Sequence, residues 1–410
     1  MFFTTADVNS ERIQQQLQTL AQIGGQPTGG VTRLTFSSEH LQATHLVGAW
    51  MTAAGLDVAF DRWGNLLGCT ADEGGMVLSG SHLDSVPNGG NYDGVLGVLS
   101  ALEAVTLILE RGIELKKSLG VVSFIEEEGA RFHGLMGSKL AVDNMERSGI
   151  DAIKDKDGLK YIDVLKAVEF GYPVRDFQWK DDVKTFLELH IEQGKRLEQA
   201  GIPIGVVTSI AGPTFMRVRL IGQADHAGAT EYADRRDSLL AAAEIIVAIR
   251  ELAVREFPGR GHMTVGKIEA QPNVTNVIAG VTEFNIDYRA ADNEAYQQMS
   301  QHIGEILESV ATKHQIQVDS QIMHHTDAEV SKPHIRQAYE QGAQAAGVAS
   351  QPLVSWAAHD AMNMAKIADS GMMFVPCRDG RSHTPEEYVK PEDVATGVAV
   401  LANAMFQLAT

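Results

Sequence analysis

The sequence has 410 residues, which is enough for two domains and a large core. Acidic residues outnumber basic residues by 53 to 34, and the net charge of −19 argues against nucleic acids and anionic membranes as partners. Two cysteines give no disulfide framework, and because neither a signal-peptide pattern nor a membrane-spanning apolar run is present, we expect a cytoplasmic protein.

The first half of the chain alternates predicted strands and helices. Residues 11–60 predict helices and one strand, and apolar residues recur at helical spacing over residues 95–109. The more polar stretch 138–182 is expected to be helical. Four short apolar runs are typical of buried strands, at residues 66–69, 76–78, 119–125 and 186–190. This alternation indicates an α/β domain with a mainly parallel sheet.

The pattern changes after Gly212. The predicted order becomes β-α-β-β-α-β, which is the ferredoxin-like order: strand 215–221, helix 238–256, strands 262–269 and 282–289, helix 294–314 and strand 316–323. A helix at 334–346 and a strand at 372–376 then resume the α/β pattern. We expect a discontinuous catalytic metal-binding domain, residues 1–211 and 326–410, carrying a lid or dimerisation domain at residues 212–325.

Several metal-binding side chains follow the predicted strands closely. Because the carboxyl ends of parallel strands meet at one edge of a sheet, these side chains are expected to converge. Imidazole and carboxylate groups suit zinc and similar ions. If Asp93 bridges two ions, each ion has three protein ligands and keeps an open position, as in catalytic sites. The candidate ligands are His82, Asp93, Glu128, His190 and His383.

Five segments carry a family resemblance that covers essentially the whole chain. Residues 79–87, 127–132, 190–194, 225–228 and 359–361 resemble the amidase/hydantoinase/carbamoylase group of dinuclear zinc hydrolases. That group includes N-carbamoyl-L-amino acid hydrolases, allantoate amidohydrolases, ureidoglycolate amidohydrolases and β-ureidopropionase-type enzymes. The resemblance implies two divalent ions in each subunit, with zinc expected and manganese, cobalt or nickel as alternatives.

The resemblance also implies a role for each residue of the metal centre. His82 and His190 would bind one ion, Glu128 and His383 the other, and Asp93 would bridge them. Asp84 would orient His82. Glu127 would be the general base, although acidic residues at positions 127 and 128 also suit the first turn of a helix.

The resemblance assigns substrate contacts mainly to the lid. His226 would stabilise the developing oxyanion, often in the site of the partner subunit. Asn276 and Arg289 would hold the substrate carboxylate, because guanidinium forms bidentate bonds to carboxylates. Gln193 would contact the ureido group. Each also has a structural alternative: Asn276 as a turn cap, His226 as a turn residue and Arg289 as a surface residue. A homodimer through the lid is expected.

The implied activity is hydrolysis of a ureido C–N bond on a small carboxylate-bearing substrate. An N-carbamoyl-L-amino acid is favoured, because Gly212-Pro213-Thr214-Phe215 lacks the basic residues that allantoate amidohydrolases typically carry there. Trp356 and Ala358 depart from the small residues and glycine usual in the group. Allantoate and other ureido acids remain the main alternative. An aminoacylase or peptidase is disfavoured by His190, and a non-catalytic binding protein is disfavoured by the complete ligand set.

Overall fold

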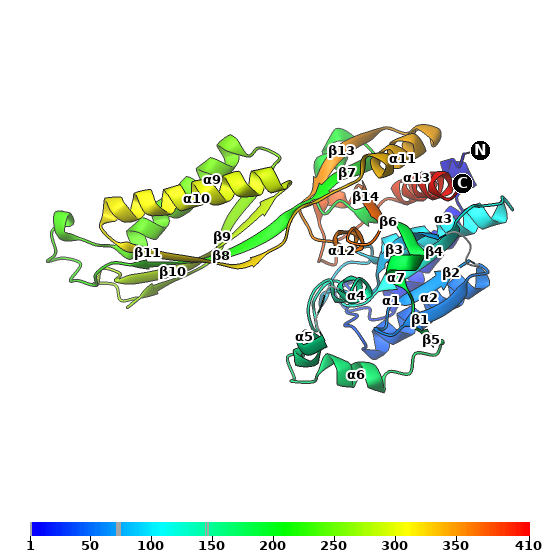
Figure 1. Cartoon of the computed structure of the whole chain (residues 1–410), viewed down its shortest axis with the longest axis horizontal. Helices are drawn as coiled ribbons and strands as arrows, with labels where there is room; N and C mark the ends of the chain where they lie inside the picture. Colours follow the sequence, from blue (N-terminus) through cyan, green and yellow to red (C-terminus); the bar gives the residue numbers. More distant parts are fainter. Residues whose placement is uncertain (1, 71–74, 144, 146) are drawn as a thin grey trace. The chain divides into compact units, whose positions relative to one another are not determined.

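The computed structural model describes residues 2–70, 75–143, 145 and 147–410. The chain forms two compact units, which are described separately below (Figure 1). The first unit contains Met1–Thr208, Ser331–Leu353 and His359–Thr410, and the second contains Ser209–Val330 and Val354–Ala358. Across the described ranges, no helix combines the length and the apolar character needed to cross a membrane.

The centre of the large sheet is parallel, which confirms the predicted α/β class. The parallel strands lie in the order β14 (Asp369–Val375), β6 (Val183–Ile191), β3 (Met76–His82) and β4 (Ser118–Phe124). Antiparallel neighbours continue the sheet: β2 (Leu66–Cys69) and β1 (Asp57–Asp61) beyond β4, and β7 (Ile204–Ile210) beyond β14. Short strands complete it: β5 (Val174–Arg175), β12 (Glu329–Val330) and β13 (Ser350–Ser355).

Two long apolar helices pack closely on β6. They are α3 (Val95–Glu110) and α13 (Pro391–Ala409), and nearly every residue of each is buried except near the ends. Each places a glycine against the strand. A Cβ atom at Gly97 would lie 2.5 Å from the Leu189 carbonyl oxygen, and one at Gly397 would lie 2.7 Å from the Leu189 side chain. These glycines therefore allow the close approach of both helices.

Alternation along β6 sends neighbouring side chains to opposite faces of the sheet. Leu187 and Leu189 join the apolar cluster of α3 and α13. Phe186, on the other face, contacts the ring of Phe124. Glu188 accepts a hydrogen bond from the Ala361 N–H of α12 (Asp360–Met364) at 3.1 Å. His190 therefore lies on the α12 face, near the carboxyl end of its strand.

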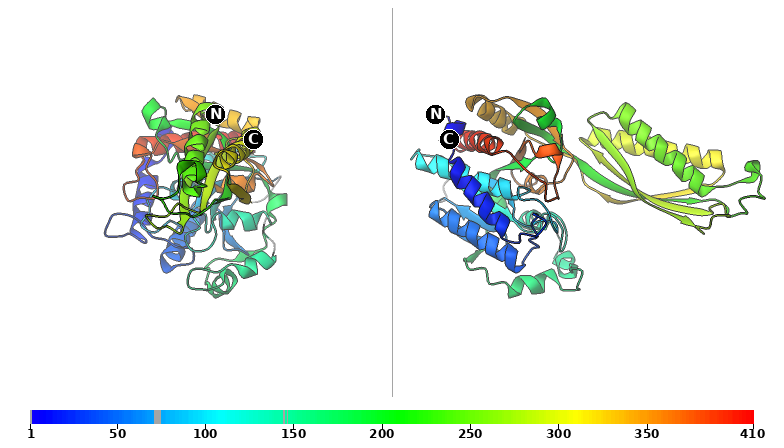
Figure 2. Two further views of the ribbon diagram at one scale, coloured as in Figure 1. Left: turned by 90° about the vertical axis from the view of Figure 1, so that its left-hand side faces the viewer. Right: turned by 180° about the vertical axis from the view of Figure 1, so that it is seen from behind.

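The two ends of the chain are joined. Phe3 N–H donates to Asn403 Oδ1 at 2.8 Å, and Asn403 Nδ2 donates to the Phe3 carbonyl at 2.8 Å. Both termini accordingly lie close together in every view (Figure 2). The remaining helices of the first unit are α1 (Ser10–Gln22), α2 (Ser38–Ala53), α4 (Met136–Ala141), α5 (Arg147–Ala152), α6 (Tyr161–Ala167), α7 (Trp179–Asp182), α8 (Arg196–Ala200) and α11 (Pro333–Ala345), with 3₁₀ turns at Thr5–Asp7 and Arg378–Gly380.

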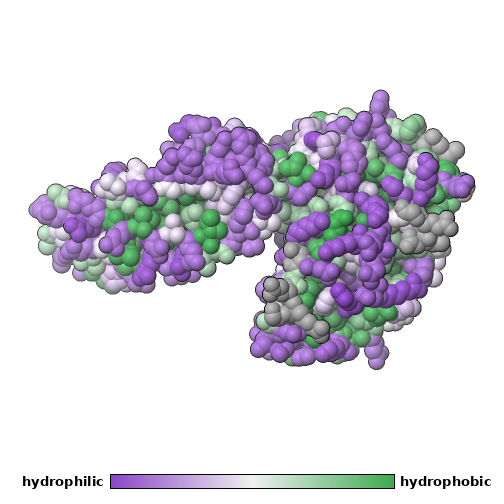
Figure 3. Space-filling view, in the orientation of Figure 1, coloured by the Kyte–Doolittle hydropathy of each residue, from purple (hydrophilic) through white to green (hydrophobic). Residues whose placement is uncertain are grey.

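The second unit is an antiparallel sheet with two helices on one face. Its elements follow the order β8 (Gly212–Ile221), α9 (Ser238–Glu256), β9 (Gly261–Gln271), β10 (Val281–Ala290), α10 (Asn293–His314) and β11 (Gln317–His325), with a 3₁₀ turn at Tyr232–Asp234. The sheet order is β11-β8-β10-β9. Alternate residues of β8, including Val218 and Leu220, are buried against both helices. In Figure 3, hydrophobic patches are scattered over a mainly hydrophilic surface.

Candidate metal centre

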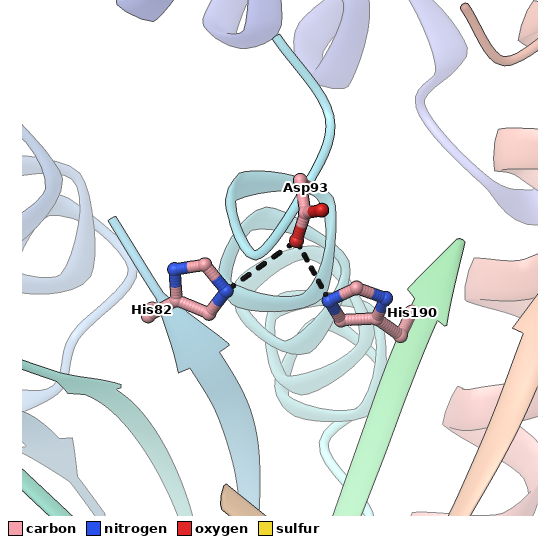
Figure 4. A group of neighbouring side chains, drawn as sticks. All are labelled: His82, Asp93 and His190. Atoms are coloured by element: carbon pink, nitrogen blue, oxygen red, sulfur yellow. Dashed lines mark ion pairs between the residues drawn. The ribbon is translucent and has the colours of Figure 1, made fainter. Parts of the chain in front are cut away.

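The carboxyl ends of β3 and β6 bring two histidines and an aspartate together. His82 is the last residue of β3, and His190 is the last but one of β6. Asp93 lies on the loop that precedes α3, and its side chain points between the two imidazole rings (Figure 4). Asp93 Oδ1 is 3.5 Å from His82 Nε2 and 3.0 Å from His190 Nε2. All three side chains are buried.

Main-chain contacts turn both imidazoles toward this point. His82 Nδ1 lies 3.0 Å from the Asp84 carbonyl oxygen, and His190 Nδ1 lies 3.0 Å from the Ile191 carbonyl oxygen. Because a carbonyl only accepts hydrogen bonds, each Nδ1 carries the hydrogen, and each neutral ring keeps its lone pair on Nε2. His82 Nε2 is buried and has no hydrogen-bond partner within the described part of the chain. This donor set fits a metal ion.

A second ligand group uses the other oxygen of Asp93. His383 Nε2 lies 3.4 Å from Asp93 Oδ2 and 3.1 Å from Glu128 Oε2. The two groups, His82–Asp93–His190 and Asp93–Glu128–His383, each hold their potential ligand atoms within 4.8 Å of one another. Hydrogen bonds to Asp93 and Glu128 raise the pKa of His383 to about 10. The excess of carboxylates around these rings therefore favours a cation at this position.

Glu127 faces the first group, and Asp84 holds its loop. Glu127 Oε2 lies 3.6 Å from His82 Nε2, and burial raises the pKa of Glu127 well above its usual range despite the attraction of His82. The Asp84 carboxylate accepts the main-chain N–H groups of Glu127 and Glu128 at 3.2 Å each. Asp84 thus contacts His82 through its carbonyl oxygen and through its carboxylate, whose Oδ1 lies 3.6 Å from His82 Nδ1, and the same carboxylate holds the Glu127 loop.

Gln193 also contacts the shared aspartate. Its Nε2 donates to Asp93 Oδ2 at 2.9 Å, and because a carboxylate only accepts, this contact fixes the orientation of the amide. The amide oxygen, Oε1, is buried and has no hydrogen-bond partner in the described structure.

Several buried acidic residues around the centre were not predicted as functional, and three of them accept hydrogen bonds from neighbouring groups. Glu126 accepts the main-chain N–H groups of Arg131 and Phe132 at 2.8 and 2.5 Å. Glu188 accepts Ser81 Oγ–H at 2.7 Å and lies with His190 and His359 in a further group of potential metal ligands. Glu387 accepts main-chain N–H groups of the Asp93 loop. The only sequence signal for Glu387 is its place four residues after His383.

His226 and Asn276 lie together in the second unit. Ala227 N–H donates to the Asn276 carbonyl at 3.0 Å, and His226 forms an isolated bridge with Val277. The exposed His226 ring accepts N–H groups of Gly228 and Ala229 on Nδ1, both at 3.1 Å. In the neutral ring the hydrogen is therefore on Nε2, which is free to donate.

Arg289 lies elsewhere in the same unit. Its Nη1 donates to the Trp356 carbonyl oxygen at 2.7 Å, and its Nε and Nη2 contact the Asp287 carboxylate at 3.3 and 3.2 Å. Asn276 precedes the first residue of β10, whereas Arg289 is next to its last. At about 3.4 Å per residue, the eight steps from Val281 to Arg289 span roughly 27 Å. One chain does not bring Asn276 and Arg289 to a single small carboxylate.

Comparison with known proteins places the chain in a family. Residues 78–407, more than half of the chain, match the model of Peptidase family M20/M25/M40. The chain belongs to this family, and the resemblance inferred from the five sequence segments is confirmed.

Several similar proteins are named amidohydrolases. An N-carbamoyl-L-amino acid amidohydrolase of Geobacillus stearothermophilus is 38% identical over 409 residues, covering 98% of this chain and 99% of the relative. An allantoate amidohydrolase of Bacillus subtilis (strain 168) is 35% identical over 403 residues, with 97% of each chain covered. The crystal structure of an amidase of the hydantoinase/carbamoylase family from Burkholderia multivorans is 32% identical, covers 98% of both chains and has a TM-score of 0.91.

Proposed function

We propose that the chain is a metal-dependent amidohydrolase that cleaves the C–N bond of a ureido group, with an N-carbamoyl-L-amino acid as substrate. The observation that carries this proposal is the pair of ligand groups sharing Asp93 beside the buried Glu127. Similarity to N-carbamoyl-L-amino acid amidohydrolases over almost the whole chain supports the substrate class. The products are the amino acid, ammonia and carbon dioxide.

The candidate ligand groups support a site for two divalent ions. His82 and His190 would hold one ion and Glu128 and His383 the other, with Asp93 as a ligand common to both groups. Zinc is the expected ion, and manganese, cobalt or nickel accept the same nitrogen and oxygen ligands. When bound, such ions polarise a carbonyl group and lower the pKa of water.

Glu127 is the proton carrier of the reaction. Its carboxylate takes a proton from the attacking water, the water oxygen bonds to the carbonyl carbon, and the protonated Glu127 then gives the proton to the leaving nitrogen. The C–N bond breaks to release the amino acid and carbamic acid, which decomposes to ammonia and carbon dioxide. Glu127 Oε2 lies 3.6 Å from His82 Nε2, so the carboxylate is beside the proposed ligand group, where the reaction takes place.

Three further side chains recognise the substrate. Gln193 Oε1 accepts an N–H of the ureido group, because it is buried without another partner among the described residues. His226 Nε2–H donates to the oxyanion of the tetrahedral intermediate. Arg289 binds the substrate carboxylate by charge-assisted hydrogen bonds, replacing part of its contact with Asp287. The second unit is then a ferredoxin-like lid.

A homodimer completes the site. Because Asn276 and Arg289 are separated along β10, the two residues reach one substrate only if they come from different chains. His226 lies beside Asn276, so the same chain provides both residues to the site. We therefore propose that each substrate meets Arg289 of one chain and His226 with Asn276 of the other.

An allantoate amidohydrolase is the second candidate. It is favoured by the similarity to the Bacillus subtilis relative and to a second such enzyme from Escherichia coli (strain K12). The segment Gly212–Phe215 argues for the first candidate, since Phe215 stacks on His324 where a basic residue would serve a second ureido group.

The test is ammonia release by the zinc- or manganese-loaded protein from N-carbamoyl-L-amino acids, allantoate and N-acetyl amino acids. Glu127→Gln should retain both ions and lose at least about a thousandfold in kcat, because the proton carrier is lost. Glu110→Gln, an exposed glutamate on α3, is the matched control. Cleavage of acyl or peptide substrates with no ammonia from any ureido compound would overturn the proposal.

A further inference from the structure

The main chain at Asp93 is held by a buried acidic residue, Glu387, on the loop that precedes α13. The side chain of Glu387 is only 3% exposed. Its Oε1 accepts the main-chain N–H groups of Tyr92 and Asp93 at 2.7 and 2.9 Å. These two hydrogen bonds join residues almost 300 positions apart in the sequence. They fix the backbone on which the Asp93 carboxylate is carried.

The second oxygen of Glu387 reaches the Asp93 side chain through Ser382. Ser382 Oγ lies 3.0 Å from Glu387 Oε2 and 2.5 Å from Asp93 Oδ2. Asp93 Oδ2 is the oxygen that faces His383. The Ser382 hydroxyl therefore links the buried Glu387 to the oxygen assigned to the second ion.

The loop before α3 leaves room for the Glu387 side chain because residue 90 is a glycine. A Cβ atom built on Gly90 would lie 2.1 Å from Glu387 Cδ and Oε1, so any larger residue at this position would displace the carboxylate. Gly90, Asp93 and Glu387 thus form one packed arrangement. Glu386, the adjacent residue, is exposed and pairs with Arg381 at 3.2 Å.

We propose that Glu387, acting with Ser382, is a positioning residue that sets the place and orientation of the Asp93 carboxylate and so allows one aspartate to serve two ions. This inference rests on the proposed metal centre. Partners that hydrogen-bond to metal ligands typically change metal affinity about 10- to 100-fold when they are removed. A residue that only stabilises the loop would lower thermal stability without changing metal binding.

The experiment titrates Zn²⁺ and Co²⁺ into the full metal-free chain by calorimetry and by the visible absorption of bound Co²⁺. Glu387→Ala and Ser382→Ala should each weaken binding of at least one ion by about 10- to 100-fold and change the Co²⁺ spectrum. Glu387→Gln should bind within about threefold of wild type, because its amide oxygen still accepts both N–H groups and its NH₂ donates to Ser382. Glu386→Ala is the matched control and should bind as wild type.

Two results overturn the inference. One is wild-type affinity for both ions in Ser382→Ala and in folded Glu387→Ala, with only the melting temperature lowered. The other is a loss in Glu387→Gln as large as that in the alanine variant. If Glu387→Ala does not fold, the Ser382→Ala and Glu387→Gln titrations decide. Failure of the wild-type chain to bind two ions would instead contradict the proposed function.

Discussion

At the scale of single residues, three consecutive glutamates have three different surroundings. Glu126 adopts a left-handed backbone conformation, with φ of 53°, so the chain turns sharply there. As a result Glu126 accepts hydrogen bonds from its own loop, Glu127 faces His82 and Glu128 faces His383. The sequence predicted functions for Glu127 and Glu128 and none for Glu126. The turn that separates them is not visible in the residue pattern.

Replacing Glu126 with Ala should destabilise the protein. The change leaves the N–H groups of Arg131 and Phe132 without their buried acceptor, at a cost of about 2–4 kcal/mol in the free energy of unfolding. Urea unfolding measures the effect. Glu114→Ala, at an exposed glutamate, should change the midpoint little, and an equal loss in both variants would contradict the assignment.

The carboxylate of Asp292 gives a pH-dependent prediction in the second unit. Although burial raises its pKa, the Arg260 guanidinium and the Ala295 N–H lower it below the usual value overall. A lowered folded-state pKa contributes stability above the unfolded pKa of about 3.9, and this stability is lost as the pH falls through the folded value.

Asp292→Asn keeps a capping side chain on α10 but removes this charge. The variant should be less stable than wild type at pH 7, and the difference should shrink as the pH falls below about 4. Urea midpoints at pH 7 and pH 3 measure it. A constant difference at both values would show that the Arg260 contact does not depend on charge.

At the scale of elements, the glycines of α13 and α10 have opposite expected effects. A methyl group at Gly397 would overlap Leu189 and Val375, whereas nothing lies within 4 Å of a Cβ at Gly304. Gly397→Ala should destabilise by about 1–3 kcal/mol through overpacking, despite the better helix propensity of alanine. Gly304→Ala should stabilise by up to about 1 kcal/mol. Thermal unfolding of both variants decides, and a stabilised Gly397→Ala would contradict the packing.

The central elements were predictable because their patterns are local. Helix 238–256 was predicted with the limits that α9 has, and the buried runs at β3, β4 and β6 were recognised. Three short outer strands were missed for physical reasons. Three of the six residues of β13 are polar and a fourth is Pro352, and β5 and β12 have only two residues each, so none has a periodicity of its own. Such strands form because a neighbouring strand offers free hydrogen-bonding groups.

At the scale of the whole molecule, the candidate site depends on contacts between distant parts of the sequence. The five predicted ligands come from four strand ends and meet because parallel strands share one edge. The support that Glu387 and Ser382 give to Asp93 joins residues almost 300 positions apart in the sequence. No local pattern distinguishes Glu387 from the exposed Glu386, so the ligands were predictable and their support was not.

The proposed dimer can be tested by mixing inactive chains. Glu127→Gln and His226→Ala chains, each inactive alone, should regain about a quarter of wild-type ammonia release when subunits exchange randomly, because half of the dimers are mixed and each has one intact site. A mixture of Glu127→Gln chains with chains that carry both Glu127→Gln and His226→Ala should stay inactive. No recovery in mixed dimers verified by affinity tags would place His226 in the site of its own chain.

The fixed orientation of the Gln193 amide has a consequence for the substrates that the proposed site rejects. Its amide nitrogen is committed to Asp93, so its buried oxygen cannot turn away from an incoming molecule. In the proposed site, the NH₂ of a carbamoyl group would donate a hydrogen bond to that oxygen, whereas the methyl of an acetyl group would leave it without one. Sites that demand a hydrogen bond reject analogues lacking it by about 10⁴-fold. Discrimination then comes from the free-energy penalty of leaving Gln193 Oε1 without a hydrogen bond when the wrong compound binds. Gln193→Leu should reduce this discrimination, so that N-acetyl amino acids are accepted more readily.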